Sequence, residues 1–313
     1  MKTNNSSEMS RFKAVDILYL VLAALPLLGG MVLRVLTRGA SEGIEVTGAQ
    51  IYFSIPMPIQ DLVITESQIN SWLVILSIFW LIRYLTHGLT VNCATKRQML
   101  AEWAVEKCEG LVKDNMGDYF LKTAGGSFVP FIMAIMVLSA FSSLVTLVGL
   151  FPPTSDINVV AGWAILVFII ITYYKNKCGP IHYLKSFADP ALMTPLNVIS
   201  EVATPVSMAF RHYGNVLSGA VISTLVGTAL AGLSKMLFGW LPGVLGEIPF
   251  LQIGIPAILS VYFDLFSGLL QAFIFAMLTM LYVSGGFALD DWQVLKAKRE
   301  AKKAERQKNQ SVA

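Results

Sequence analysis

The chain has 313 residues, of which 55% are hydrophobic and only 14% are charged, with a mean hydropathy of +0.64. Soluble domains carry about 25% charged residues, so this composition favours a protein whose solvent is the lipid bilayer. The formal net charge of +3 is too small to indicate a nucleic-acid partner. Three cysteines and three histidines, without a CxxC pair or zinc spacing, predict no metal site and no cofactor.

Six apolar segments are long enough to cross a bilayer, since a spanning helix needs about 20 mostly apolar residues. They are Val15–Leu36, Ser71–Leu89, Phe128–Phe151, Val159–Tyr174, Leu192–Phe238 and Ile253–Ser284. The sequence therefore predicts an all-α polytopic membrane protein with about six membrane helices. The first segment follows basic residues, as a signal peptide does, but it is long for that purpose and we interpret it as a retained helix. The fifth exceeds one crossing, so it is either strongly tilted or broken near Pro195 or Pro205.

Basic residues are concentrated at alternate ends of these segments, which predicts their orientation. They occupy the second and fourth loops and the tail after Asp290, whereas Pro152–Ile157 and Gly239–Gln252 contain no Lys or Arg. Six crossings then place both termini in the cytoplasm, with the chain in a bacterial cell membrane. Arg34 and Arg38 are exceptions, because they fall on the outer side. The basic tail is either a solvated segment near anionic lipid headgroups or a specific binding arm.

Three charged residues inside the apolar segments, Glu201, Arg211 and Asp264, are candidates for function. A charge at the centre of a membrane helix costs at least about 2.5–3.5 kcal/mol, which makes such residues functional suspects. Polar residues at helical spacing share one face with Arg211, namely Thr204, Ser207, Asn215 and Ser218. The alternative is a structural Arg that neutralises a carboxylate within the bundle.

A second polar face lies on the sixth segment and consists of Ser260, Asp264, Ser267 and Gln271. In an α-helix, Asp264 and Gln271 would be two turns apart on one face, about 10.5 Å. Gln271 alone could be an interhelical hydrogen-bonding residue, whereas Asp264 needs a partner or water. His212 follows Arg211 directly and points about 100° away from the polar face. We therefore expect His212 to form an interhelical hydrogen bond rather than to relay protons.

The stretch Pro195–Gly219 resembles the signature helix of the a subunit of the F-type ATP synthase. That signature is an Arg, then Gly-Asn, then a small residue and a Gly, which are here Arg211, Gly214, Asn215, Ser218 and Gly219. The segment Gly268–Ser284 resembles the last helix of that family, with Gln271 at its characteristic glutamine. Two shorter stretches, Pro153–Asn158 and Ile64–Trp72, also resemble segments of that family. The resemblance covers about residues 52–285.

The resemblance implies a subunit of the membrane Fo sector whose last two long helices lie tilted and antiparallel against a ring of c subunits. It divides the chain into an N-terminal extension with an extra apolar helix (1–50), a membrane domain (51–285) and a basic cytoplasmic tail (286–313). It implies an ion-translocating stator with two offset half-channels, and as partners the c ring, b-type peripheral stalk subunits and the rest of the synthase. The chain has no P-loop motif, so the chemistry of ATP must lie in the partners. Whether the coupling ion is H⁺ or Na⁺ stays open.

The chain departs from the family pattern at two positions. Many members carry a Glu nine residues after the Arg, where this chain has Ala220, and some carry a His seven residues before the glutamine, where it has Asp264. If Arg211 faces Gln271 in an antiparallel pair, the numbers of facing residues add up to 482. Asp264 then faces position 218, and position 220 faces position 262, so one carboxyl group could reach the same volume from either helix.

These positions predict two groups of polar residues along the two long helices. Asn215, Ser218 and Asp264 are expected to line an outer half-channel, and Glu201, Thr204 and Ser207 a cytoplasmic one, with Arg211 and Gln271 between them. A stand-alone secondary transporter would instead show paired repeats with broken helices, and a membrane enzyme would need a nucleophile–base pair or a metal cluster. Neither pattern is present in the sequence.

Overall fold

The computed structural model describes residues 3–37, 48–58, 61–91, 95–122, 128–187, 191–240, 249–252, 258–259 and 261–310. Six helical segments in these ranges are long and apolar enough to cross a membrane. They are Ala14–Thr37, Glu66–Thr86, Val129–Val148, Ile157–Cys178, Thr194–Phe238 and Val261–Gly286. Each overlaps one of the six predicted segments, so the prediction of an all-α polytopic membrane protein is confirmed.

The helices are α1 (Thr3–Thr37), α2 (Glu66–Thr86), α3 (Lys96–Met116), α4 (Asp118–Lys122), α5 (Val129–Leu144), α6 (Ile157–Lys175), α7 (Pro180–Phe187), α8 (Thr194–Phe238), α10 (Gly268–Gly286) and α11 (Leu289–Gln310). Short 3₁₀ turns connect them: η1 (Val145–Val148), η2 (Pro153–Ser155), η3 (Asn176–Cys178), η4 (Ala191–Met193) and η6 (Phe250–Gln252). A π-helix, η7 (Val261–Ser267), leads directly into α10. The strands β1 (Ile51–Ile55) and β2 (Leu62–Thr65) form an antiparallel hairpin before α2.

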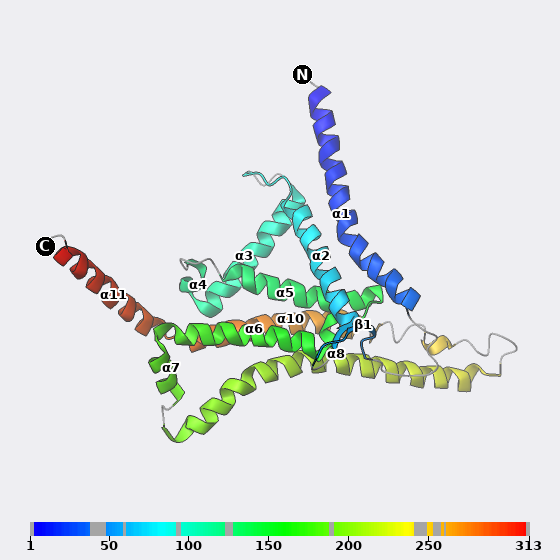
Figure 1. Cartoon of the computed structure of the whole chain (residues 1–313). Helices are drawn as coiled ribbons and strands as arrows, with labels where there is room; N and C mark the ends of the chain where they lie inside the picture. Colours follow the sequence, from blue (N-terminus) through cyan, green and yellow to red (C-terminus); the bar gives the residue numbers. More distant parts are fainter. Residues whose placement is uncertain are drawn as a thin grey trace.

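α8 is one continuous helix of 45 residues, so the alternative of a break near either proline is wrong. Pro195 lies in the first turn, where its missing N–H leaves no hydrogen bond unmade, and Pro205 is accommodated inside the helix. At 1.5 Å per residue α8 is about 68 Å long, more than twice the roughly 30 Å of a hydrocarbon core. Figure 1 shows it as a long curved rod along one side of the bundle. A helix of this length fits a membrane only if it is strongly tilted or extends beyond it.

α10 forms the centre of the bundle and contacts α3, α5, α6 and α8 (Figure 1). Phe275, Met280 and Val283 on α10 are fully buried, and they pack in one cluster with Ile132 of α5 and Val167 of α6. Lipid tails are as apolar as these side chains, so the helices associate through close packing rather than by escape from water.

α1 is packed against α2. Ser77 of α2 donates a hydrogen bond of 2.7 Å to the Ala23 carbonyl of α1 in the buried middle of the pair. Gly30 allows the two helices to approach closely, since a Cβ there would lie 2.7 Å from a methyl carbon of Leu73. Towards its N-terminal end, Asp16 of α1 is paired with Arg97 of α3.

The end of α6 and the start of α11 are held together by an aromatic cage. The Lys177 ammonium lies 4.5–5.8 Å from the centroids of five rings, those of Tyr119, Tyr173, Tyr174, Phe287 and Trp292. It also donates a hydrogen bond of 3.0 Å to the Tyr119 hydroxyl. Cation–π contacts contribute about 0.5–1 kcal/mol each at exposed sites and more when desolvated. The cage therefore stabilises the arrangement of α4, α6 and α11 and of the residue that follows α10 at this end of the bundle.

Candidate functional site

α8 and the segment formed by η7 and α10 run antiparallel in a defined register. The Ser267 hydroxyl donates to Oδ1 of Asn215 at 2.9 Å, and Nδ2 of Asn215 donates to the Ser267 carbonyl at 3.4 Å. One turn further along α8, a Cβ on Gly219 would lie 3.1 Å from the Cβ of Phe263. Both pairs of residue numbers add up to 482, the sum expected from an Arg211–Gln271 pair.

Arg211 and Gln271 meet in a pocket of about 410 Å³ between the two helices. The pocket is lined by Arg211, Gly214, Asn215, Ser218, Ser267, Leu270, Gln271 and Ile274. Gln271 is buried, at 4% exposure, whereas Arg211 is exposed on the open side of α8. The arrangement holds a permanent cation at one wall of a polar pocket, since an Arg side chain does not lose its proton in proteins.

The polar face predicted for the sixth segment is not built on a regular α-helix. Val261–Ser267 forms a π-helix, so the two α-turns assumed between Asp264 and Gln271 are wrong. π-helical turns occur mostly inside α-helices and frequently at functional sites. The backbone of Asp264 belongs to this turn, while its side chain and Ser260 lie outside the described part of the structure.

His212 forms an interhelical contact, as predicted. Its Nε2 lies 3.4 Å from the Ser139 hydroxyl of α5, and its imidazole meets the rings of Trp163 and Phe275 edge-on. The side chain is fully buried. His212 therefore ties α8 to α5, α6 and α10 on the side of α8 that faces away from the open surface.

A row of serines on α5, which the sequence analysis missed, runs beside the pocket. Ser139, Ser142 and Ser143 are buried, and a Cβ on Gly268 of α10 would lie 2.6 Å from the Cβ of Ser143. Among the described residues, the Ser142 hydroxyl has no hydrogen-bond partner. A buried hydroxyl of this kind is a place where water can bind. The signal in the sequence is a set of serines at helical spacing within an apolar segment.

The same polar character continues to the end of the bundle that carries the β1–β2 hairpin. Asn70 of α2 donates to the Phe151 carbonyl at 2.8 Å, and the Ser67 hydroxyl donates to Asp156. Thr154 is fully buried, and its hydroxyl has no partner among the described residues. The turn before α6 is thus attached to α2 through polar side chains.

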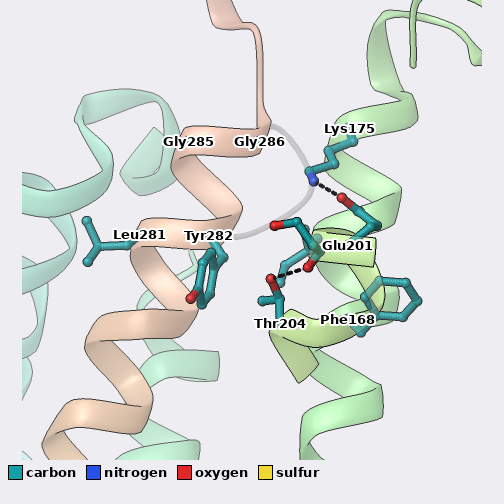
Figure 2. Close-up of a pocket in the computed structure, with 10 residues that line it drawn as sticks. Phe168, Lys175, Glu201, Thr204, Leu281, Tyr282, Gly285 and Gly286 are labelled. Carbon is teal, nitrogen blue, oxygen red and sulfur yellow. Dashed lines mark hydrogen bonds and ion pairs between the residues drawn. The ribbon is translucent and has the colours of Figure 1, made fainter. Parts of the chain in front are cut away.

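A second pocket, of about 270 Å³, surrounds Glu201 nearer the start of α8. Figure 2 shows it between α10, which contributes Tyr282, and α6 and α8, which contribute Lys175 and Thr204. Lys175 Nζ lies 2.6 Å from Oε2 of Glu201, and the Tyr183 hydroxyl donates to Oε1 at 3.3 Å. Burial and then the negative charge of Glu201 raise the pKa of Tyr183, so this phenol keeps its proton and remains a donor.

Most of the remaining predicted residues line one or the other of the two pockets. Thr204 lines the Glu201 pocket and donates to the Ser200 carbonyl at 2.9 Å. Asn215 and Ser218 line the Arg211 pocket. Ser207 is exposed on α8 and lines neither of these two pockets. The structure therefore brings Arg211, Gln271, Asn215 and Ser218 together, and it separates Glu201 and Thr204 from them.

These features define a helical multi-pass membrane protein with two polar pockets along one long, exposed helix and a fixed cation at the wall of one of them. The chain belongs to the ATP synthase A chain family, whose family model matches residues 68–284.

Individual relatives support this assignment. The chain is 29% identical over 226 residues to ATP synthase subunit a of Desulforamulus reducens, a match that covers 70% of this chain and 78% of the relative. It is 34% identical over 195 residues to ATP synthase subunit a of Priestia megaterium, covering 60% and 77%. It is also 28% identical over 268 residues to the sodium-ion-specific ATP synthase subunit a of Propionigenium modestum, covering 77% and 85%.

The register of α8 against η7 can be tested by cross-linking. We expect a disulfide between Gly219→Cys and Phe263→Cys under mild oxidation, because their Cβ atoms would be 3.1 Å apart, close to the roughly 3.5–4.5 Å of native disulfides. The product is measured as a linked peptide by mass spectrometry. The matched control pairs Ala220→Cys with Phe263→Cys, which places the thiol on an exposed position of the same helix. Equal or faster linking in the control contradicts the register.

Proposed function

We propose that this chain is the ion-translocating stator of an F-type ATP synthase, carrying H⁺ or Na⁺ to and from a rotating c ring through two offset half-channels. The observation that carries this proposal is that Arg211 and Gln271 line one of two polar pockets on antiparallel helices, while the other pocket surrounds Glu201. The geometry suits an ion that enters by one pocket, leaves by the other and cannot pass directly between them.

The outer half-channel is assigned to the Arg211 pocket and the polar groups beyond it. Asn215, Ser218 and Ser267 line this pocket, and the buried serines of α5 lie next to it. The polar residues at the turn before α6 extend the path towards the outer surface. Hydroxyl and amide groups of this kind can bind water or a partly dehydrated cation in an otherwise apolar bundle.

The cytoplasmic half-channel is assigned to the Glu201 pocket. Glu201 precedes Arg211 by ten residues, which corresponds to about 15 Å along α8. Its carboxylate accepts from Lys175 and Tyr183, so an ion that leaves by this route meets a paired carboxylate rather than a free one. Thr204 supplies a further polar group, and Ser207 extends the same exposed face towards Arg211.

Arg211 separates the two routes. Since it keeps its proton, it blocks a straight relay from one pocket to the other. It can, however, attract the ionised carboxylate of a c subunit and so help to release the ion bound there. The ion must then travel with the ring, and each charge that crosses is worth about 2.3 kcal/mol per 100 mV of membrane potential. This coupling converts an ion gradient into rotation.

The partners follow from the same assignment. The c ring would pack against the open face of α8, where Val206, Phe210 and Leu225 are strongly exposed, as is Arg211. Peripheral stalk subunits of the b type would hold the chain against rotation, and the catalytic subunits would carry the chemistry of ATP. The proposed orientation has both termini in the cytoplasm, with the Glu201 pocket and the Lys177 cage on that side of the cell membrane.

Arg211→Ala should lower ion-driven ATP synthesis in membrane vesicles at least about 100-fold, since losing a charge interaction of about 3 kcal/mol corresponds to that factor. ATP hydrolysis by the soluble sector should be unchanged. Lys235→Met, which removes another exposed cation of α8, should retain synthesis within about twofold. Near-normal synthesis in a fully assembled Arg211→Ala complex would exclude the proposed role.

Glu201→Gln should slow synthesis about three- to tenfold without loss of assembly, because the carboxylate on the cytoplasmic route is neutralised. The measurement is the synthesis rate as a function of cytoplasmic pH. Asp290→Asn, an exposed acid at the start of α11, serves as the control. An unchanged rate and pH profile for Glu201→Gln would mean that this carboxylate lies near the lipid headgroups and takes no part in ion transport.

Asp264→Asn should also depress ion-driven synthesis strongly, about tenfold or more, because the outer half-channel would lose its acid. Adding Ala220→Glu should restore a measurable part, since in the 482 register position 220 lies opposite position 262, close to Asp264. The control is Ala220→Gln in the same Asp264→Asn background. If Asp264→Asn is harmless, or if the Glu variant assembles but works no better than the Gln variant, a carboxyl group at position 220 does not replace Asp264.

A further inference from the structure

Arg34 is a cation on the side of the membrane where the other loops carry almost none, and it lies outside the residues that match the family. It occupies the last turn of α1. Its Nε lies 3.4 Å from Oε1 of Glu66, the first residue of α2, and its Nη1 donates to the Gly149 carbonyl after η1. One side chain of the N-terminal helix therefore joins α2 to the turn that leads towards α6.

Glu66 is a carboxylate that needs this cation. It is only 3% exposed, and among the described residues its Oε1 accepts no hydrogen bond, so its contact with Arg34 is a charge pair. On the next residue of α2, the Ser67 hydroxyl donates a hydrogen bond to Asp156. Without Arg34, Glu66 would have no cation within ion-pair distance among the described residues. A buried carboxylate that loses its partner takes up a proton or a cation instead.

The rest of α1 keeps Arg34 in this position. The helix is attached at its middle by Ser77 and Gly30 and towards its N-terminal end by Asp16. Asp16 pairs with Arg97 and lies 3.3 Å from His87, which follows the last residue of α2, at the opposite end of that helix from Glu66. Among the described side chains, α1 thus makes charge contacts through Asp16 and through Arg34, and only the Arg34 contact lies beside the polar turn before α6.

We propose that α1 is a working part of the outer half-channel, in which Arg34 is the fixed counter-cation of Glu66 and sets the net charge at the entrance. This inference rests on the proposed function, because the polar turn is an ion entrance only if the outer route runs there. Arg34 is a positioning residue: it keeps Glu66 from binding the coupling cation and holds the Gly149 turn in place. A channel entrance lined by charges of one sign concentrates counter-ions, so the Arg34–Glu66 pair determines how strongly the entrance attracts cations.

The proposal predicts shifts of opposite sign for the two members of the pair. In assembled complexes, the synthesis rate is measured against the outer concentration of the coupling ion at fixed membrane potential. Arg34→Met leaves Glu66 without its counter-cation, so Glu66 should attract the incoming cation, and the half-saturating concentration should fall about fivefold. Glu66→Gln leaves the entrance positive, and the value should rise by about the same factor. The double variant Arg34→Met/Glu66→Gln should return to within about twofold of the wild type, and Arg34→Lys should stay there.

Asp16→Asn is the matched control, because it removes the charge contact at the other end of α1 and should leave the half-saturating concentration unchanged. If neither Arg34→Met nor Glu66→Gln shifts this concentration, or if both shift it in the same direction, the proposal is overturned. Glu66→Gln alone decides the question if Arg34→Met does not assemble. These outcomes are distinct from a failure of the proposed function, which would appear as full activity in Arg211→Ala.

Discussion

The contact of α8 with η7 and α10 fixes the geometry on which the candidate site depends. Two points define the register: the paired hydrogen bonds between Asn215 and Ser267, and the close approach of Gly219 to Phe263. This register places Arg211 and Gln271 in the lining of one pocket, and no direct bond between them is needed to hold them there. Because lipid does not drive apolar helices together, such hydrogen bonds and small residues decide how two membrane helices align.

Much of this arrangement could be predicted from the sequence, because a bilayer restricts the possible structures. Six apolar segments had to be helices, since backbone groups cannot remain unpaired in hydrocarbon. The Arg211–Gln271 register, with its sum of 482, agrees with the observed Asn215–Ser267 pair because α-helical spacing is regular along α8. The interhelical role of His212 followed from its angle to the polar face of that helix.

Other features could not be predicted, because they arise between segments that are distant in the sequence. The π-helix at Val261–Ser267 changes local spacing and has no signal in the apolar pattern. The Lys175–Glu201 pair joins α6 to α8, and the Lys177 cage gathers rings from several elements. α8 was correctly found to be longer than one crossing, but whether Pro205 breaks a helix depends on its neighbours, and here the helix continues through it.

The carboxylates of Glu66 and Glu201, at the two ends of the bundle, are each paired with a cation, whereas Arg211 is exposed. Glu201 is paired with Lys175 from α6, and Glu66 is paired with Arg34 from α1, so each carboxylate depends on a cation from a different helix. Arg211 lies between these pairs and is exposed on the open face of α8. In the proposed mechanism, these pairs within the chain keep the two carboxylates from holding the passing ion. The exposed arginine is placed to meet a charge from outside the chain, and a carboxylate that moves past on a rotating ring is a partner of that kind.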